Sequence, residues 1–201
     1  MGWIESGETW GERAADWACL VEPYARRAND ALFDRGGVGP GTRLLDIACG
    51  SGYAASVAAG RGATVAGLDA SEALIAIARA RTPDAAFRVG DMFELSPADH
   101  VDATLNQGGT GRPGVAEQML ADAGLEFVDR GAAQVINEWP DLDLAARALA
   151  SAGPSWPALR RAGYDRFAEA IREAIRPMYT PGLGVRIISE FGWIMGRVPG
   201  G

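Results

Sequence analysis

Three short apolar segments alternate with helical segments in the first half of the chain, and this alternation limits the fold more than any other feature. Residues 43–49, 63–68 and 85–89 are predicted strands. Small and helix-forming residues between them predict two helices, the second capped by Ser71 and ending at about Arg81. Strands that alternate with helices in this way are typical of an α/β fold with a doubly wound, mostly parallel sheet.

The first predicted strand ends in a glycine-rich turn, where residues 46–52 read Asp-Ile-Ala-Cys-Gly-Ser-Gly. Gly50 and Gly52 allow a tight turn in which the backbone approaches a ligand without a Cβ clash. The helix that follows presents unpaired amides and the positive end of its dipole, which suit a carboxylate or a phosphate. The turn by itself is weak evidence, because most such turns are structural.

Acidic residues also close the next two predicted strands. Asp69 ends the second strand, and Asp91-Met92 follows the third. Open α/β sheets bind ligands at the carboxyl ends of their strands. Asp69 is therefore placed to accept hydrogen bonds from two ribose hydroxyls, and Asp91 with Met92 to hold an adenine. Any one of these aspartates alone would be an N-cap or a solvated residue, but three features in order on consecutive strands predict a nucleotide-like ligand.

Two ligands remain open on the residues alone. The stretch Gly50-Ser-Gly52-Tyr-Ala-Ala55 fits the G-x-G-x-x-[GA] pattern of dinucleotide sites. Asp46, four residues before Gly50, can meet a ligand ammonium directly or through water. That acidic position and the Gly90-Asp-Met sequence favour S-adenosylmethionine.

The span 42–95, from Thr-Arg-Leu-Leu-Asp-Ile-Ala-Cys-Gly-Ser-Gly to Gly-Asp-Met-Phe-Glu-Leu, resembles the class I S-adenosylmethionine-dependent methyltransferases. Residues 10–17, Trp-Gly-Glu-Arg-Ala-Ala-Asp-Trp, resemble the lead-in helix of small-molecule methyltransferases of the methyltransferase-11 type, and residues 113–195 look like the carboxyl-terminal region of that group. The resemblance implies a Rossmann-like fold. It also implies a set of cofactor contacts: Asp46, Ala48, Gly50 and Gly52 at the methionine end, Asp69 and Ala70 at the ribose, Asp91 and Met92 at the adenine, Asn106 beside the methyl group, and Arg13 and Trp17 as cover. Core packing is an equally good explanation of Trp17.

The whole chain, residues 1–201, is expected to form a single methyltransferase-like domain. Residues 8–34 are expected to be amino-terminal cap helices, which Pro23 kinks or splits. Residues 42–106 form the expected cofactor-binding half, with a fourth strand at 101–106. Further strands are predicted at 125–136 and 183–195, and residues 141–176 between them are an expected helical cap insertion, with Asp141 as the cap of its first helix.

One part of the family pattern is missing. Only residues 107–112 stand between Asn106 and Pro113, where the family continues with a helix and its fifth strand. About six strands are therefore expected. We predict that the last strand moves beside residues 101–106 and gives the order 3-2-1-4-7-6 with an antiparallel final strand, because the bridge and helix 113–123 can cross one strand and a gap in the sheet would leave backbone groups unpaired.

Composition excludes several classes of protein. The formal net charge of −7 argues against a general nucleic-acid binder. No apolar run is long enough for a membrane span, and the two cysteines indicate a reducing, cytoplasmic location. The cysteines lie far apart and the chain has one histidine, so no metal site is expected. That histidine, His100, precedes the fourth strand and is interpreted as a surface residue.

The predicted function is methyl transfer from S-adenosylmethionine to a small-molecule acceptor. Tyr179, Glu190, Glu138 and Trp139 are candidates for an acceptor pocket, although each has an ordinary packing or solvated explanation; no catalytic residue is assigned. Two alternatives stay open: a truncated fold that binds the cofactor without catalysis, and an NAD(P)-dependent oxidoreductase. The absence of lysine removes the commonest catalytic arrangement of the latter.

Overall fold

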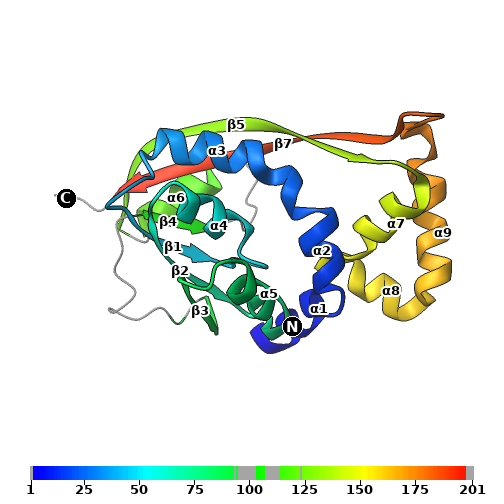
Figure 1. Cartoon of the computed structure of the whole chain (residues 1–201), viewed down its shortest axis with the longest axis horizontal. Helices are drawn as coiled ribbons and strands as arrows, with labels where there is room; N and C mark the ends of the chain where they lie inside the picture. Colours follow the sequence, from blue (N-terminus) through cyan, green and yellow to red (C-terminus); the bar gives the residue numbers. More distant parts are fainter. Residues whose placement is uncertain (1, 93, 95–102, 107–113, 123, 198–201) are drawn as a thin grey trace.

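The computed structural model describes residues 2–92, 94, 103–106, 114–122 and 124–197. A parallel sheet with its helices lies at one side of the molecule, and a group of helices lies at the other. A long two-stranded ribbon extends from the first part to the second along the top of the view (Figure 1). The helices and strands in chain order are α1 (Trp3–Gly11), α2 (Ala14–Leu20), the 3-10 helix η1 (Glu22–Ala25), α3 (Arg26–Arg35), β1 (Arg43–Ile47), α4 (Tyr53–Gly60), β2 (Thr64–Asp69), α5 (Glu72–Arg81), β3 (Ala86–Val89), β4 (Ala103–Asn106), α6 (Val115–Asp122), β5 (Glu126–Trp139), α7 (Leu142–Ala150), the 3-10 helix η3 (Gly153–Ser155), α8 (Trp156–Ala162), α9 (Tyr164–Ile175), the 3-10 helix η4 (Arg176–Met178), β6 (Tyr179–Thr180) and β7 (Gly184–Arg197).

The first sheet confirms the α/β prediction. Its four strands lie in the order β3-β2-β1-β4, and all three pairings are parallel. Apolar side chains from the strands and from α3, α4 and α5 form one buried cluster, which includes Phe33, Leu44, Ala55 and Ile75. Burial on this scale explains why the central strands read as short apolar runs.

The second sheet has three strands in the order β5-β7-β6, and its two long strands, β5 and β7, form the ribbon. β5 pairs antiparallel with β7 from Glu126 opposite Arg197 to Trp139 opposite Val185, and the short β6 pairs with the amino-terminal end of β7. α3 packs against β5 along one side of this ribbon. The antiparallel final strand was predicted; the two-residue strand β6 was not.

The predicted strand order 3-2-1-4-7-6, in which 6 is the strand at 125–136 and 7 the strand at 183–195, is not confirmed as a whole. The neighbours 3-2-1-4 and 7-6 are present, but the step from 4 to 7 is not found among the described residues. Among the described residues, β4 pairs with β1, whereas β7 pairs with β5 and β6. The prediction placed β7 between β4 and β5, so that both of its edges would pair. In the structure β5 pairs with one edge of β7 along almost its whole length, as predicted, and β6 rather than β4 pairs with the other edge.

The amino-terminal helices are divided, as the proline predicted. Pro23 lies in the first turn of η1, between α2 and α3. A proline fits there because the first residues of a helix have no intrahelical partner for their amides. The helical region begins at Trp3 rather than at residue 8.

The helices that follow β5 have a core of their own. Trp139 and Val185 from the ribbon pack with Ala145, Ala148 and Ile175 from α7 and α9. Asp141 caps α7 as predicted, and its carboxylate accepts from the amide of Leu144 at 2.7 Å. Within the described residues, no helix is both long and apolar enough to cross a membrane.

Candidate functional site

The turn between β1 and α4, residues 48–52, is called the glycine loop below. Three of its residues are left-handed: Ala48 with φ 59°, Gly50 with φ 56° and Gly52 with φ 70°. This conformation is uncommon for a residue with a Cβ, and Ala48 is the only described residue other than glycine that adopts it. Gly52 is also required sterically, because a Cβ there would lie 2.8 Å from the Cβ of Ala78 on α5. The backbone of the glycine loop is therefore strained at Ala48 and leaves no room for a side chain at Gly52.

The amides of Gly50, Ser51 and Gly52 in the glycine loop already have acceptors from within the chain. The amide of Gly50 donates to Asp69 Oδ2 at 2.8 Å, that of Ser51 to Glu22 Oε1 at 2.9 Å, and that of Gly52 to the carbonyl of Cys49 at 2.9 Å. The second oxygen of Asp69 accepts from the amide of Ser71 at 2.8 Å. Asp69 thus turns toward the loop and the start of α5, as well as closing β2.

Glu22 was not predicted as a site residue. Its Oε1 also accepts from the indole Nε1 of Trp17 at 2.9 Å, and its Oε2 accepts from the hydroxyl of Ser51 and from Arg81 Nη1, the latter at 3.1 Å. Arg81 in turn donates to the carbonyl of Ser51 at 2.8 Å. No local sequence signal marks Glu22, because its partner Ser51 lies 29 residues away.

Asp46 is the most buried acidic group of the site. Its side chain is inaccessible to solvent, and neither carboxylate oxygen makes a hydrogen bond of normal geometry with a described residue. Burial raises its pKa well above the ordinary value, and the charges of Glu22 and Asp69 raise it further, while the nearby amide of Ala55 acts in the opposite sense. A buried polar group without a partner requires an explanation.

Burial shifts the two neighbouring titratable groups as well. The pKa of Asp69 is raised mainly by burial, and the amides of Ser71 and Gly50 oppose that rise. Burial likewise raises the pKa of the Cys49 thiol, which keeps that thiol protonated. The site therefore favours forms with less negative charge, or a ligand that brings positive charge.

The remaining predicted contacts lie at the same edge of the sheet. Ala70 follows β2, and its carbonyl meets α1 at Gly7, where a Cβ would lie 2.1 Å from the oxygen. Asp91 and Met92 follow β3 and are partly exposed. Asn106 ends β4, in register with Ile47 at the end of β1.

The two predicted covering residues behave differently. Trp17 lies at the glycine loop through its hydrogen bond to Glu22, and its ring meets that of Trp10 edge to face with centroids 4.8 Å apart. Arg13 pairs with Asp16 at 2.5 Å and lies 4.4 Å from the ring centroid of Tyr164. The structure brings Trp17 to the loop and connects Arg13 to the helices after β5.

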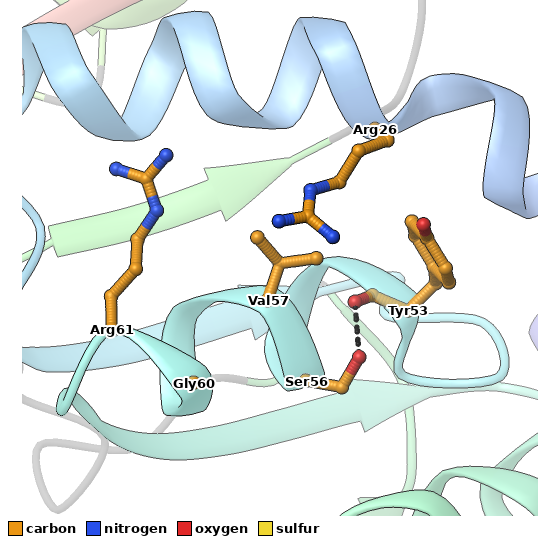
Figure 2. A pocket seen from close by; sticks show the side chains of 6 residues that line it. All are labelled: Arg26, Tyr53, Ser56, Val57, Gly60 and Arg61. Carbon is orange, nitrogen blue, oxygen red and sulfur yellow. Dashed lines mark hydrogen bonds between the residues drawn. The ribbon is translucent and has the colours of Figure 1, made fainter.

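A hollow of about 250 Å³ lies beside α4, between α4 and α3 (Figure 2). Arg26 and Arg61 lie on either side of Val57 in it, but both guanidinium groups pair with Asp30, at 2.9 and 2.8 Å. Their charges are already compensated, so this hollow is not a strong anion site. A second hollow of about 410 Å³ lies where α1 and α2 meet α5 and includes Arg13 and Asp16 in its lining.

The four residues that the sequence suggested for an acceptor pocket do not point into one common cavity. Trp139 is buried, and its indole donates to the carbonyl of Leu20 at 3.0 Å. Tyr179 packs against the same core, whereas Glu138 is exposed and pairs with Arg186 at 3.4 Å. Glu190 is exposed on β7. His100 lies outside the described residues, and in the part of the chain that the structure describes no group of three or more His, Cys, Asp or Glu side chains could hold a metal ion.

A family model described as a methyltransferase domain matches residues 44–124, which include all but the first residue of β1, the glycine loop, β2 and β3. Residues 44–124 are thus similar to a methyltransferase domain. A buried acidic carboxylate and a left-handed glycine loop suit a cationic amino acid with a nucleoside attached.

Curated relatives of the methyltransferase domain differ in what they methylate. The chain is 37% identical over 90 residues to a dTDP-3-amino-3,6-dideoxy-alpha-D-glucopyranose N,N-dimethyltransferase of Streptomyces fradiae, which covers 45% of this chain and 30% of that protein. It is 34% identical over 91 residues to a trans-aconitate 2-methyltransferase of Delftia acidovorans, covering 41% and 33%. The chain thus matches about a third of the length of these relatives.

A likeness extends beyond the methyltransferase domain in a solved structure. The crystal structure of a functionally unknown protein from Deinococcus radiodurans R1 aligns with a TM-score of 0.53 at 20% identity, over 89% of each chain. This likeness concerns the fold alone.

Proposed function

We propose that the protein transfers a methyl group from S-adenosylmethionine to a small-molecule acceptor. The single observation that carries the proposal is Asp46, a fully buried carboxyl group beside the glycine loop that has no hydrogen-bond partner among the described residues, in a segment similar to a methyltransferase domain. A ligand that brings an ammonium and a sulfonium compensates that group. The relatives that act on a nucleotide sugar and on trans-aconitate support a small acceptor.

The predicted residues have distinct tasks in this proposal. Asp46, Ala48, Gly50 and Gly52 position the methionine end, while Asp69 and Ala70 face the ribose, Asp91 and Met92 the adenine, and Asn106 the region of the reactive methyl. The sulfonium carries its own leaving group, so the protein has to supply proximity, alignment and exclusion of water. A general base is needed only when the acceptor must lose a proton.

We also propose that α7, α8 and α9 cover the acceptor side. Their core joins the end of the ribbon, and Arg147 on α7 pairs with Asp16 on α2 at 2.5 Å. These contacts hold the helices beside the amino-terminal elements that reach the glycine loop. The chain would then act as one unit over residues 1–201.

Calorimetric titration with S-adenosylmethionine, S-adenosylhomocysteine and NAD tests the cofactor. We expect heat with the first two ligands and none with NAD. Asp69→Ala should weaken binding at least tenfold, because Asp69 holds Gly50 and faces the ribose, whereas Asp165→Ala, a matched change at an exposed position on α9, should bind as the wild type does. NAD binding without S-adenosylmethionine binding would favour the oxidoreductase alternative.

Turnover requires a second measurement. Transfer of a labelled methyl group is followed across amines, carboxylic acids, phenols and thiols. Product formed with at least one class supports the proposed activity. Cofactor binding without transfer to any of them would favour a fold that binds the cofactor but does not catalyse methylation.

A further inference from the structure

The carboxylate of Glu22 fills a group of four hydrogen-bond donors at the glycine loop. These donors are the amide and hydroxyl of Ser51, Nη1 of Arg81 and the indole Nε1 of Trp17. They come from three separate parts of the chain, and each contacts one of the two Glu22 oxygens. Glu22 is mostly buried there, with 10% of its side chain exposed.

The chemistry of these donors is that of a carboxylate-binding site. A guanidinium, a hydroxyl, an indole and an amide at the start of a helix each donate to oxygen, and together they favour one negative charge. The site also has the necessary space, because Gly50 lacks a side chain and a Cβ there would lie 2.6 Å from Glu22 Oε1. The side chain of Glu22 shows that a carboxylate fits.

The charges around the site disfavour Glu22 as a permanent occupant. Three carboxylates, from Glu22, Asp46 and Asp69, lie close enough to influence one another, and Arg81 pairs with Glu22. Asp46 has no hydrogen-bond partner in the described part of the chain, so the negative charge of Glu22 adds to the cost of burying the Asp46 carboxylate. A ligand with both a carboxylate and a cationic group would replace the charge of Glu22 and compensate Asp46.

We propose that Glu22 is a built-in competitor of the cofactor, occupying the carboxylate-binding site until the amino-acid carboxylate of the cofactor displaces it. Ser51, Arg81 and Trp17 then bind the carboxylate of the ligand. Glu22 is the first residue of η1, at the junction of α2 and α3, so a change in a few backbone angles there moves its side chain. This inference rests on the proposed cofactor.

Competition of this kind lowers the apparent affinity in proportion to the fraction of molecules in which the site is free. Two ligands distinguish competition by Glu22 from a general effect of its substitution on the whole site. S-adenosylhomocysteine has the amino-acid carboxylate, whereas 5′-methylthioadenosine has the same nucleoside without it. Removing the charge of Glu22 should therefore strengthen binding of the first ligand and leave the second unchanged.

The experiment is calorimetry of both ligands with the full chain as wild type, Glu22→Gln, Glu22→Ala and Glu173→Gln. The last variant removes one negative charge from an exposed position on α9 and serves as the matched control. We expect Glu22→Gln and Glu22→Ala to bind S-adenosylhomocysteine about tenfold more tightly, which corresponds to about 1.4 kcal/mol. 5′-Methylthioadenosine should change less than about twofold on the same scale, and Glu173→Gln should match the wild type.

Trp17 supplies an independent readout, because displacement of Glu22 breaks its indole hydrogen bond. We expect S-adenosylhomocysteine, but not 5′-methylthioadenosine, to change tryptophan fluorescence in the wild type, and Trp17→Phe to lose that change. Glu22→Gln keeps the side-chain shape and remains informative when Glu22→Ala does not fold.

The inference is overturned when the Glu22 variants bind S-adenosylhomocysteine no more tightly than the wild type, or when both ligands gain equally. Wild-type binding separates this result from failure of the proposed function. A folded wild type and folded variants that bind neither adenosine ligand would contradict the proposed function itself.

Discussion

Asp46 is an ionisable residue at a position that is otherwise suited to an apolar side chain. It lies in β1, where its neighbours are the buried side chains of the sheet, yet it carries an ionisable group with no hydrogen-bond partner among the described residues. Groups with shifted pKa values gather at functional sites because binding or chemistry, and not folding, maintains them. Replacing the carboxyl group of Asp46 should therefore raise the stability of the ligand-free protein and weaken ligand binding.

We expect Asp46→Asn to stabilise the ligand-free protein by about 1–3 kcal/mol, since it removes an uncompensated buried charge. The pKa of Asp46 is raised in the folded state, so its charge destabilises the fold as the pH rises through that pKa. The advantage of Asn should accordingly grow as the pH rises above the ordinary aspartate value of about 3.9. Thermal unfolding at a series of pH values measures it.

The same Asp46→Asn variant should bind S-adenosylhomocysteine at least tenfold more weakly, as calorimetry would show. Asp165→Asn, on the exposed surface of α9, should change neither property. An Asn variant that is less stable than the wild type at every pH would show that the carboxylate has a structural partner.

At the residue scale, local sequence patterns predict the acidic and glycine positions of the site but not Glu22. Gly50, Gly52 and Asp69 stand in one turn and at the end of the adjacent strand, so their spacing along the chain is enough to bring them together. Glu22 reaches Ser51 only through the packing of the amino-terminal helices on the sheet. Its sequence context is that of an ordinary helix residue before a proline.

At the element scale, α1 packs closely on the turn between β2 and α5. Gly7 makes this approach possible, because a Cβ there would lie 2.1 Å from the carbonyl oxygen of Ala70. Ala70 is a proposed ribose contact, so the same backbone supports both α1 and the cofactor site.

We expect Gly7→Ala to destabilise the protein by about 1–3 kcal/mol, because the added methyl group meets backbone that cannot rotate away. Gly60→Ala is the matched control: it lies at the end of α4 with no atom within 4 Å of its Cβ position, and should stabilise by up to about 1 kcal/mol. Urea unfolding of the two variants tests the difference. Equal effects would contradict close packing at Gly7.

The strands show how far element prediction extends. The parallel strands follow from apolar runs, and the structure places β1, β2 and β3 within a few residues of their predicted positions. The pairing of β7 with β5 agrees with the prediction, but the predicted place of this pair beside β4 is not found among the described residues. Alternation of side chains identifies a strand, but not which edge of a sheet it joins.

At the scale of the whole molecule, Asp16 connects the amino-terminal helices to the helices after β5. Its carboxylate is 2.5 Å from both Arg13 and Arg147. Burial alone would raise its pKa, but the hydrogen bond from Arg147 and the charges of both arginines outweigh that and lower it. The group thus stabilises the folded state in its ionised form.

We expect Asp16→Asn to cost about 1–3 kcal/mol at neutral pH. Because the pKa of Asp16 is lowered on folding, its contribution is present above the ordinary value of about 3.9 and is lost as the pH falls through the folded value. The stability difference between Asp16→Asn and the wild type should therefore shrink below about pH 4. Denaturant unfolding measures it, and a difference that stays constant down to pH 2.5, roughly, would contradict the ionic origin.

The backbone around η1 has contacts on both sides of the molecule. The carbonyl of Leu20 accepts from Trp139 and the hydroxyl of Tyr24 donates to the carbonyl of Glu138, while Glu22 between them reaches the glycine loop. Displacement of Glu22 would move the segment on which the end of the ribbon rests. We therefore expect substrates to bind in a compulsory order, cofactor before acceptor, with S-adenosylhomocysteine competing against S-adenosylmethionine and not against the acceptor.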